Sequence, residues 1–313
     1  MNLFLVVFLP LAAVEGSFDR TLRVDGPVSL EVVTGSGSIE VTRGATGTVE
    51  IHGEIRVGSG LFGGVGGSDR VRKIEENPPI EQAGNVIRVG SRSDEDLFRN
   101  VSISYRIVVP PETSLVSKSG SGSQTVGDIH GPVEAKTGSG SVTIGSIGDF
   151  VTAAAGSGSI RIDAAKGRLE AKTGSGSITA LGVEGPVTAR TGSGRIEIEQ
   201  TGEGDVDVKA GSGSIQVGGV RGGLDVNSGS GTVRVAGELT GDWRIHASSG
   251  SITVELPDDA AFDLDAHTSS GSIELDHPVT VSGRLSRKEI RGAVRGGGHR
   301  LTVDSSSGSI SIR

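Results

Sequence analysis

The sequence contains no cysteine, which excludes disulfides, thiolate nucleophiles, cysteine-ligated metals and lipid-modified cysteines. Aromatic residues are scarce, with seven Phe, one Tyr and one Trp among 313 residues. The core must therefore be thin and built from small or branched side chains. Acidic residues outnumber basic ones, and the net charge is −8. Non-specific nucleic-acid binding requires an excess of cations, so we expect no nucleic-acid partner.

The sequence also lacks an apolar run long enough to span a bilayer as a helix. The N-terminal run from Leu3 to Val14 is short, contains Pro10 and fits the hydrophobic region of a secretory signal peptide. Ala13 and Gly16 are small enough to flank a cleavage site. No Lys or Arg precedes the run, and a buried first strand is the alternative. We expect a signal peptide over residues 1–16 and an exported protein without a transmembrane segment.

Glycine is in excess, at 52 residues, and serine is also abundant. The two residue types gather in a Gly-Ser-Gly triplet, as in TGSGSITA at residues 173–180. From Gly120 to Gly229 the triplets begin every 18 or 19 residues, and an earlier copy begins at Gly35. Such a fixed period indicates a repeat architecture. Degenerate Ser-Ser-Gly copies continue the series at Ser248, Ser269 and Ser306.

Each repeat places two alternating apolar stretches around a short glycine-containing link, as at Ile178 to Ala180 and Val187 to Ala189. This alternation predicts half-buried strands, and no stretch of comparable length has a helical period. One repeat cannot bury its apolar face alone, whereas stacked repeats can. We predict an all-β fold: a single-stranded parallel β-solenoid, or β-helix, of about 18 residues per coil. Parallel crossovers are generally right-handed, which makes right-handed coils the default expectation.

Left-handed hexapeptide β-helices also have 18-residue coils, but they need an aliphatic residue at every sixth position. The apolar residues of one coil instead form two alternating pairs with one residue between them, which disfavours that class. They are Val142, Ile144, Ile147, Val151 and Ala153.

Stacked coils bring equivalent residues to about 4.8 Å from one another, so a long column of like charges is unfavourable. In the second strand of each coil, Lys172, Arg190 and Lys209 would stack, and Glu170 and Asp207 on the same face can offset them. The outward column of the first strand places no like charges side by side. It reads Thr143, Arg161, Thr179, Glu197, Gln216, Arg234, Thr253 and Glu274.

Two insertions interrupt the repeat, at residues 58–100 and 278–305. We therefore expect a β-solenoid domain over 17–313, with an irregular N-terminal part (17–118), regular repeats (119–277) and a C-terminal insertion and cap (278–313). The second insertion carries a basic cluster that could meet an anionic envelope polymer or lipid headgroups. The alternative is a solvated loop offset by nearby acids. The cluster comprises Arg284, Arg287, Lys288, Arg291, Arg295 and Arg300.

The segment ISYRIVVPPETSLVSKSGSGSQTVGDIHGPVEAKTGSGSVTI (103–144) resembles the bacterial adhesin-like β-strand-repeat family known as DUF4097. The ending GGGHRLTVDSSSGSISI (296–312) is similar to that of the same family, and the resemblance covers roughly residues 28–313. It implies a β-solenoid and frequent export or membrane tethering. It implies no enzymatic residues, so no site residue can be transferred.

Motifs for chemistry are weak. Gly58 to Gly63 fits G-x-G-x-x-G, but a dinucleotide site needs a following helix and none is predicted. The triplets offer serine hydroxyls, which are poor calcium ligands. His246 and His267 are expected in equivalent positions of successive coils, and a metal site would want a third ligand. Trp243 occupies an inward position and is expected in the core.

We therefore expect a non-enzymatic, exported module of the cell envelope or cell surface, which binds through its flat faces and carries no cofactor and no metal. Its expected partner is an envelope polymer or a surface protein, and self-association through the solenoid ends is a further hypothesis. Two alternatives remain open. One is a polysaccharide-active enzyme on a β-helix, and the other is an envelope-stress signalling module whose partner binds a solenoid end or the 58–100 insertion.

Overall fold

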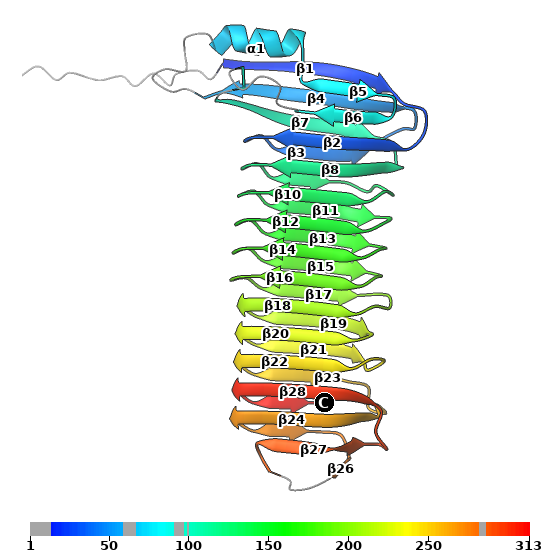
Figure 1. Ribbon diagram of the computed structural model, residues 1–313, viewed down its shortest axis with the longest axis vertical. Helices are drawn as coiled ribbons and strands as arrows, with labels where there is room; N and C mark the ends of the chain where they lie inside the picture. Colours follow the sequence, from blue (N-terminus) through cyan, green and yellow to red (C-terminus); the bar gives the residue numbers. More distant parts are fainter. Residues whose placement is uncertain (1–13, 59–66, 91–96, 99, 282–285) are drawn as a thin grey trace, which may run out of the picture.

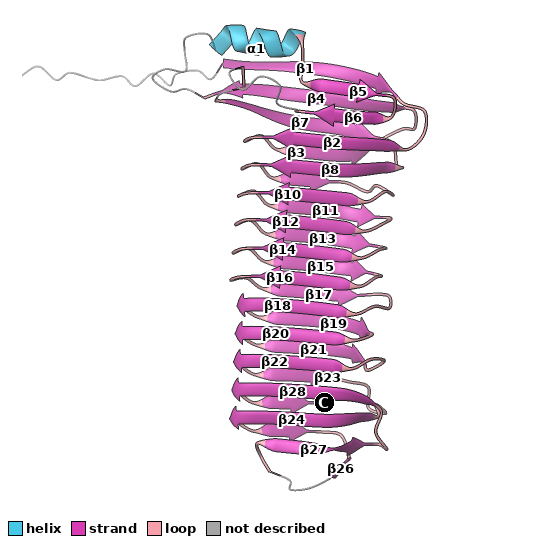
Figure 2. Ribbon diagram, viewed as in Figure 1, coloured by secondary structure: helices cyan, strands magenta, loops and turns pink. Residues whose placement is uncertain are grey.

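The computed structural model describes residues 14–58, 67–90, 97–98, 100–281 and 286–313. Within them, two long β-sheets lie face to face and enclose a narrow core, giving an elongated solenoid (Figures 1 and 2). We call the 14-stranded sheet sheet A and the 15-stranded one sheet B. The strands of sheet A, in spatial order, are β1 (Val14–Arg23), β4 (Thr48–Val57), β7 (Val101–Val109), β3 (Ile39–Arg43), β9 (Gln124–Val126), β11 (Val142–Ile147), β13 (Ile160–Ala165), β15 (Ile178–Val183), β17 (Ile196–Gln200), β19 (Ile215–Arg221), β21 (Val233–Glu238), β23 (Ile252–Glu255), β29 (Ile310–Ile312) and β25 (Ile273–Leu275).

Sheet B is built from the alternate strand of each coil, and its order confirms that successive coils stack in parallel through the regular repeats. In spatial order its strands are β26 (Val279–Val281), β27 (Glu289–Val294), β24 (Phe262–Ser270), β28 (His299–Ser307), β22 (Trp243–Ser249), β20 (Leu224–Ser230), β18 (Val206–Ser212), β16 (Val187–Thr191), β14 (Leu169–Thr173), β12 (Val151–Ala155), β10 (Val133–Thr137), β8 (Thr113–Ser119), β2 (Val28–Thr34), β6 (Val86–Val89) and β5 (Ile80–Ala83).

Apolar alternation forms the core as predicted. In β14 the side chains of Leu169 and Ala171 are buried, and in β15 those of Ile178, Ala180 and Val183 are buried. Each coil stacks on the next with an unbroken register over β14 and β16. The apolar residues identified in the coil from 142 to 153 are likewise buried, and Trp243 is fully buried, as expected.

Glycine recurs at the Gly-Ser-Gly corners even where φ is not positive, as at Gly174 and Gly176. The reason is close approach: a Cβ on Gly176 would lie 2.1 Å from the carbonyl oxygen of Gly158 in the preceding coil. In the later coils the same corner does use positive φ, for example 120° at Gly213 and 133° at Gly231, a region that glycine tolerates without steric cost.

The first insertion contains a helix that the sequence pattern did not predict, α1 (Gly67–Glu76). Only two apolar side chains, Val71 and Ile74, are buried in its ten residues. They stand at a helical spacing, but a single pair is too short a pattern to identify a helix from sequence. The helix packs on β1, and the backbone N–H of Ser17 donates to the Glu75 carboxylate at 2.9 Å. With the antiparallel pairs β1–β4, β4–β7 and β5–β6, it covers the N-terminal end of the solenoid (Figure 1).

At the other end, the coils do not stack in chain order. The last coil, β28–β29, lies between β22–β23 and β24–β25. The expected contact of Thr253 with Glu274 is therefore wrong, because Ser311 lies between them. Successive stacking of His246 and His267 is also wrong, because Asp304 separates the two strands. The end of sheet B is covered by the antiparallel strands β27 and β26.

Candidate functional site

The basic cluster predicted at 284–300 is spread along the C-terminal cap. Arg284 lies outside the described residues. Lys288 and Arg295 stand at opposite ends of β27, seven residues apart and so roughly 23 Å in an extended strand. Three of the cationic side chains already contact other groups. Arg291 pairs with Asp265 at 3.0 Å and Glu289 at 3.3 Å, the Lys288 ammonium donates to the Ser269 carbonyl, and the Arg295 guanidinium donates to the Asp258 carbonyl. Two others are held through their backbone: the N–H of the exposed Arg300 donates to the Asp242 carboxylate, and the Arg287 carbonyl accepts from the Ile273 N–H.

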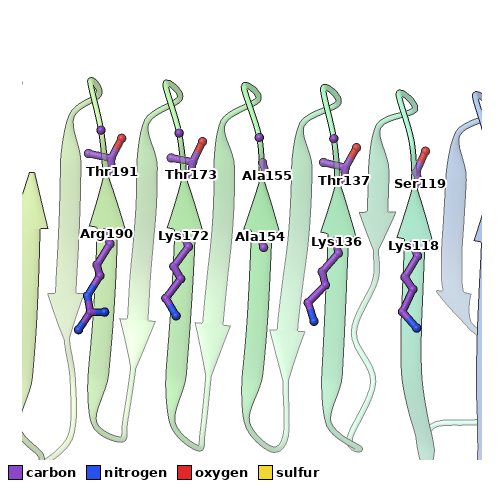
Figure 3. A pocket seen from close by; sticks show the side chains of 14 residues that line it. Lys118, Ser119, Lys136, Thr137, Ala154, Ala155, Lys172, Thr173, Arg190 and Thr191 are labelled. Atoms are coloured by element: carbon purple, nitrogen blue, oxygen red, sulfur yellow. The ribbon is translucent and has the colours of Figure 1, made fainter. Parts of the chain in front are cut away.

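A longer basic row follows the middle of sheet B, with one residue per strand, and we call it the basic row. Lys118 pairs with Lys136 in the sheet register, and Lys172, Arg190 and Lys209 pair in turn. Figure 3 shows Lys136 and Lys172 on either side of Ala154. The stacking of Lys172, Arg190 and Lys209 is confirmed. The row extends two cations further toward the N-terminus than the sequence analysis noted. Its members are Lys118, Lys136, Lys172, Arg190 and Lys209, with Ala154 of β12 in the gap.

Carboxylates offset part of this charge. Lys136 contacts Glu134 at 2.6 Å, and Lys172 contacts Glu170 at 2.5 Å. Asp207 lies between Arg190 and Lys209 of the basic row, at 3.0 and 3.4 Å. The hydrogen bond from Lys172, reinforced by the charges around it, lowers the pKa of Glu170.

These pairs remain close to solvent. The side chains of Lys136 and Lys172 are 51% and 48% exposed, so water and salt screen the pairs and each contributes little to stability. From β8 to β18 the strip carries five cations and three carboxylates (Glu134, Glu170 and Asp207). Lys118 also pairs with Glu31 of the adjacent strand β2 at 3.1 Å, so the strip is only slightly net positive, on a chain of net charge −8.

A second row, of hydroxyl side chains, runs beside the basic row at the ends of β8, β10, β14 and β16, and we call it the hydroxyl row. The equivalent residues are Ala155 in β12 and Ala210 in β18. Thr137 represents the hydroxyl row: its Oγ1 donates to the Gly122 carbonyl at 2.9 Å and accepts from the Gly140 N–H at 3.1 Å. These bonds join the strand both to the glycine corner of the preceding coil, at Gly122, and to the corner that follows the strand, at Gly140. Thr173 and Thr191 donate equivalently to the Gly158 and Gly176 carbonyls, and Ser119 donates to the Gly37 carbonyl.

Both rows are interrupted on the same strand, β12, which presents Ala154 and Ala155 (Figure 3). A depression of about 650 Å³ is centred there and extends over two strands on either side. It is shallow and open to solvent, unlike the concave pockets that bury small molecules. It is lined by the basic and hydroxyl rows from Lys118 and Ser119 to Arg190 and Thr191 and by the glycines Gly138, Gly156, Gly174 and Gly192.

Comparison with protein families decides the relationship. The model of the Toastrack family, DUF4097, matches residues 112–313, which is more than half of the chain. The chain belongs to the Toastrack family. The match begins just before β8, so it includes every coil that lines the depression. The N-terminal coil β2–β3 lies outside the matched residues, although its Gly35 corner stacks directly on Gly120 of the following coil.

Other comparisons add the following. No curated protein matches this Toastrack chain. Among solved structures, a "putative cell adhesion protein" from Clostridium sporogenes ATCC 15579 is 12% identical and covers 95% of this chain and 99% of its own, with a TM-score of 0.19. A "putative adhesin" from Bacteroides fragilis NCTC 9343 is 12% identical and covers 95% of this chain and 97% of its own, with a TM-score of 0.32.

The remaining predicted features fall elsewhere on the Toastrack fold. Most of the G-x-G-x-x-G segment lies outside the described residues, as its residues 59–63 are not placed. The described residues hold no group of three or more His, Asp or Glu side chains arranged for a metal ion. No helix among the placed segments is long and apolar enough to cross a membrane.

Proposed function

We propose that this Toastrack protein is a non-enzymatic, exported binding module of the cell envelope or cell surface, which holds an extended partner along sheet B. The observation that carries this proposal is the basic row, which presents five cations on consecutive or nearly consecutive strands of one flat face. Successive positions stand about 4.8 Å apart. A partner lying along the solenoid axis would meet the same contact repeatedly, and repeated weak contacts combine into strong binding.

The charge pattern supports binding over catalysis. A glycosidase needs one carboxylic acid whose pKa is raised, so that it can protonate the leaving group. The acids nearest the depression are Glu134 and Glu170, and each is held by a lysine of its own strand. The pKa of Glu170 is lowered, so this acid is ionised at neutral pH and suits a structural ion pair.

Export rests on the apolar N-terminal run that ends at Val14. The strand β1 begins at Val14 and pairs with β4 along its whole length. Cleavage after Ala13 would leave this pairing intact, whereas removal of the predicted residues 1–16 would take Val14 to Gly16 from β1. Fractionation of cells that produce the full chain, followed by N-terminal sequencing, tests this part: a chain that retains Met1 inside the cytoplasm would refute it.

Binding is tested with the purified protein and isolated cell envelopes. We expect saturable retention that falls as salt is added, because exposed charges are screened. Replacing the five cations of the basic row by Gln should abolish most of this retention. The matched control carries Arg161→Gln and Arg234→Gln on sheet A, and it should bind like the parent. Equal retention of both variants would contradict the proposal.

A further inference from the structure

The basic row and the hydroxyl row both change to alanine on the same strand, β12. Of the five strands from β8 to β16, the other four each present one cation and one hydroxyl. Ala155 is 6% exposed, much like Thr137 and Thr173, which are each 7% exposed. A threonine at 155 would occupy the same environment and make the same corner bonds. The strand thus departs from a pattern that its neighbours satisfy, as functional sites often do.

The electrostatics of this position also differ from the rest of the basic row. Lys136 and Lys172 stand on either side of Ala154, two strand spacings apart and so roughly 10 Å between their Cα atoms. The carboxylates that offset them sit on the lysines' own strands. The corresponding position of β12 is Thr152, which is neutral. The floor of the depression is therefore uncharged and is flanked by two lysines whose side chains are half-exposed and whose ammonium groups contact Glu134 and Glu170.

We propose that Ala154 forms the seat for one acidic sugar of a linear acidic polysaccharide that lies along the solenoid axis. Lys136 and Lys172, which also contact Glu134 and Glu170, donate from both sides to the sugar carboxylate, while the Ala154 methyl group and the lysine stems contact the apolar face of the ring. The neighbouring Lys118 and Arg190 engage further carboxylates of the same polymer. This inference rests on the proposed function and names the ligand class of that same face.

A polymer of uronic acids suits this surface better than a nucleic acid does. The depression is continuous over five strands, which span roughly 19 Å, so it accommodates several sugars in a row. Its cations are mostly lysines, which act as point charges for carboxylates and hydroxyls. The strip is interleaved with carboxylates, so it lacks the large excess of cations that the dense phosphates of a nucleic acid require.

The experiment measures the affinity of polygalacturonate for the full chain by titration calorimetry at low and high salt. Dextran serves as the neutral control, and polyphosphate and DNA serve as other polyanions. The decisive variant is Ala154→Lys, which completes the basic row but fills the seat. Its matched control, Asn227→Lys, adds the same charge to the next position of the row beyond Lys209.

We expect Ala154→Lys to weaken polygalacturonate binding about fivefold despite its added charge, whereas Asn227→Lys binds as tightly as the parent or more tightly. Lys136→Gln and Lys172→Gln should each weaken binding about two- to fivefold, the scale of an exposed charge contact. Lys209→Gln, outside the depression, should have less effect. Denaturant unfolding of every variant separates loss of binding from loss of fold.

Several outcomes would overturn the inference. Tighter binding by Ala154→Lys would show a uniform charge ladder without a seat. Equal affinity for polyphosphate or DNA would show non-specific attraction of polyanions. Failure of polygalacturonate to bind, with envelope retention intact, would remove this ligand class and leave the proposed function standing. Tight polygalacturonate binding without envelope retention would refute the proposed function and leave this ligand class standing.

Discussion

Restoring the hydroxyl row at β12 should stabilise the protein. In Ala155→Thr, the new hydroxyl would take the position that Thr137 and Thr173 occupy on the neighbouring strands. It would donate to the carbonyl of Gly140 and accept from the N–H of Gly158. Thr137 makes the equivalent bonds to the Gly122 carbonyl at 2.9 Å and from the Gly140 N–H at 3.1 Å. The threonine would enter the same environment as its neighbours, since Ala155 is buried to the same degree as Thr137 and Thr173.

The magnitude follows from two added hydrogen bonds. Each contributes a net ~1 kcal/mol, and a β-branched side chain also suits a strand. We expect the free energy of unfolding to rise by about 1–2 kcal/mol. The measurement is urea unfolding, with the midpoint and the slope compared separately, since an unchanged slope attributes the shift to stability.

Thr173→Ala is the matched opposite change, because it removes the bonds to the Gly158 carbonyl and the Gly176 N–H. It should lower the free energy of unfolding by a similar amount. The reasoning is refuted if Thr173→Ala is costly but Ala155→Thr gives no gain. The alanine would then reflect a local constraint on the backbone, and the idea that stability was forgone for a ligand seat would lose its support.

Three further changes test the fold and its charges. Gly176→Ala places a Cβ 2.1 Å from the Gly158 carbonyl oxygen and should destabilise by at least ~3 kcal/mol, measured by urea unfolding; a loss below ~1 kcal/mol would show that the corner can relax. Trp243→Ala empties a fully buried position and should cost about 3–5 kcal/mol in the same assay, with unchanged stability contradicting its core role. In Lys172→Gln, the pKa of Glu170 should rise because its main hydrogen-bond donor is lost. In the parent, the stabilisation from this pair is present at neutral pH and is lost as the pH falls through the lowered pKa. NMR titration measures the pKa of Glu170 in the parent and in the variant, and an equal pKa in the two would disprove the assignment.

Much of the fold could be predicted because each coil repeats its own local code. The alternation in Ile178 to Ala180 identifies the buried side chains without any long-range information. The corner glycines were also recognisable from their spacing. The group that excludes a side chain there was not, since at Gly176 it is a carbonyl of the preceding coil. Stacking geometry of this kind is visible only when two coils are superimposed.

The ends were less predictable, because they depend on contacts between distant segments. Helix α1 has only Val71 and Ile74 as buried apolar residues, and a single pair of apolar residues is too short a pattern to predict a helix. The order of the last coils was not predictable, because β24 and β28 share the same alternating pattern and either could pair with β22. The basic row occupies one column of the repeat, but Ala154 separates Lys118 and Lys136 from Lys172, so the cations are not continuous in that column.

The placement of β28–β29 between two coils made earlier in the chain has a consequence for the time course of assembly. A ribosome releases β22 and β24 before it releases β28, so a growing solenoid reaches a stage at which two finished sheet edges have no partner yet. Until the strand beginning at His299 arrives, these edges must either remain open or pair provisionally with each other and separate again. The final step of folding is then an insertion into the stack, and its rate would govern how long the unfinished edges are exposed to neighbouring molecules.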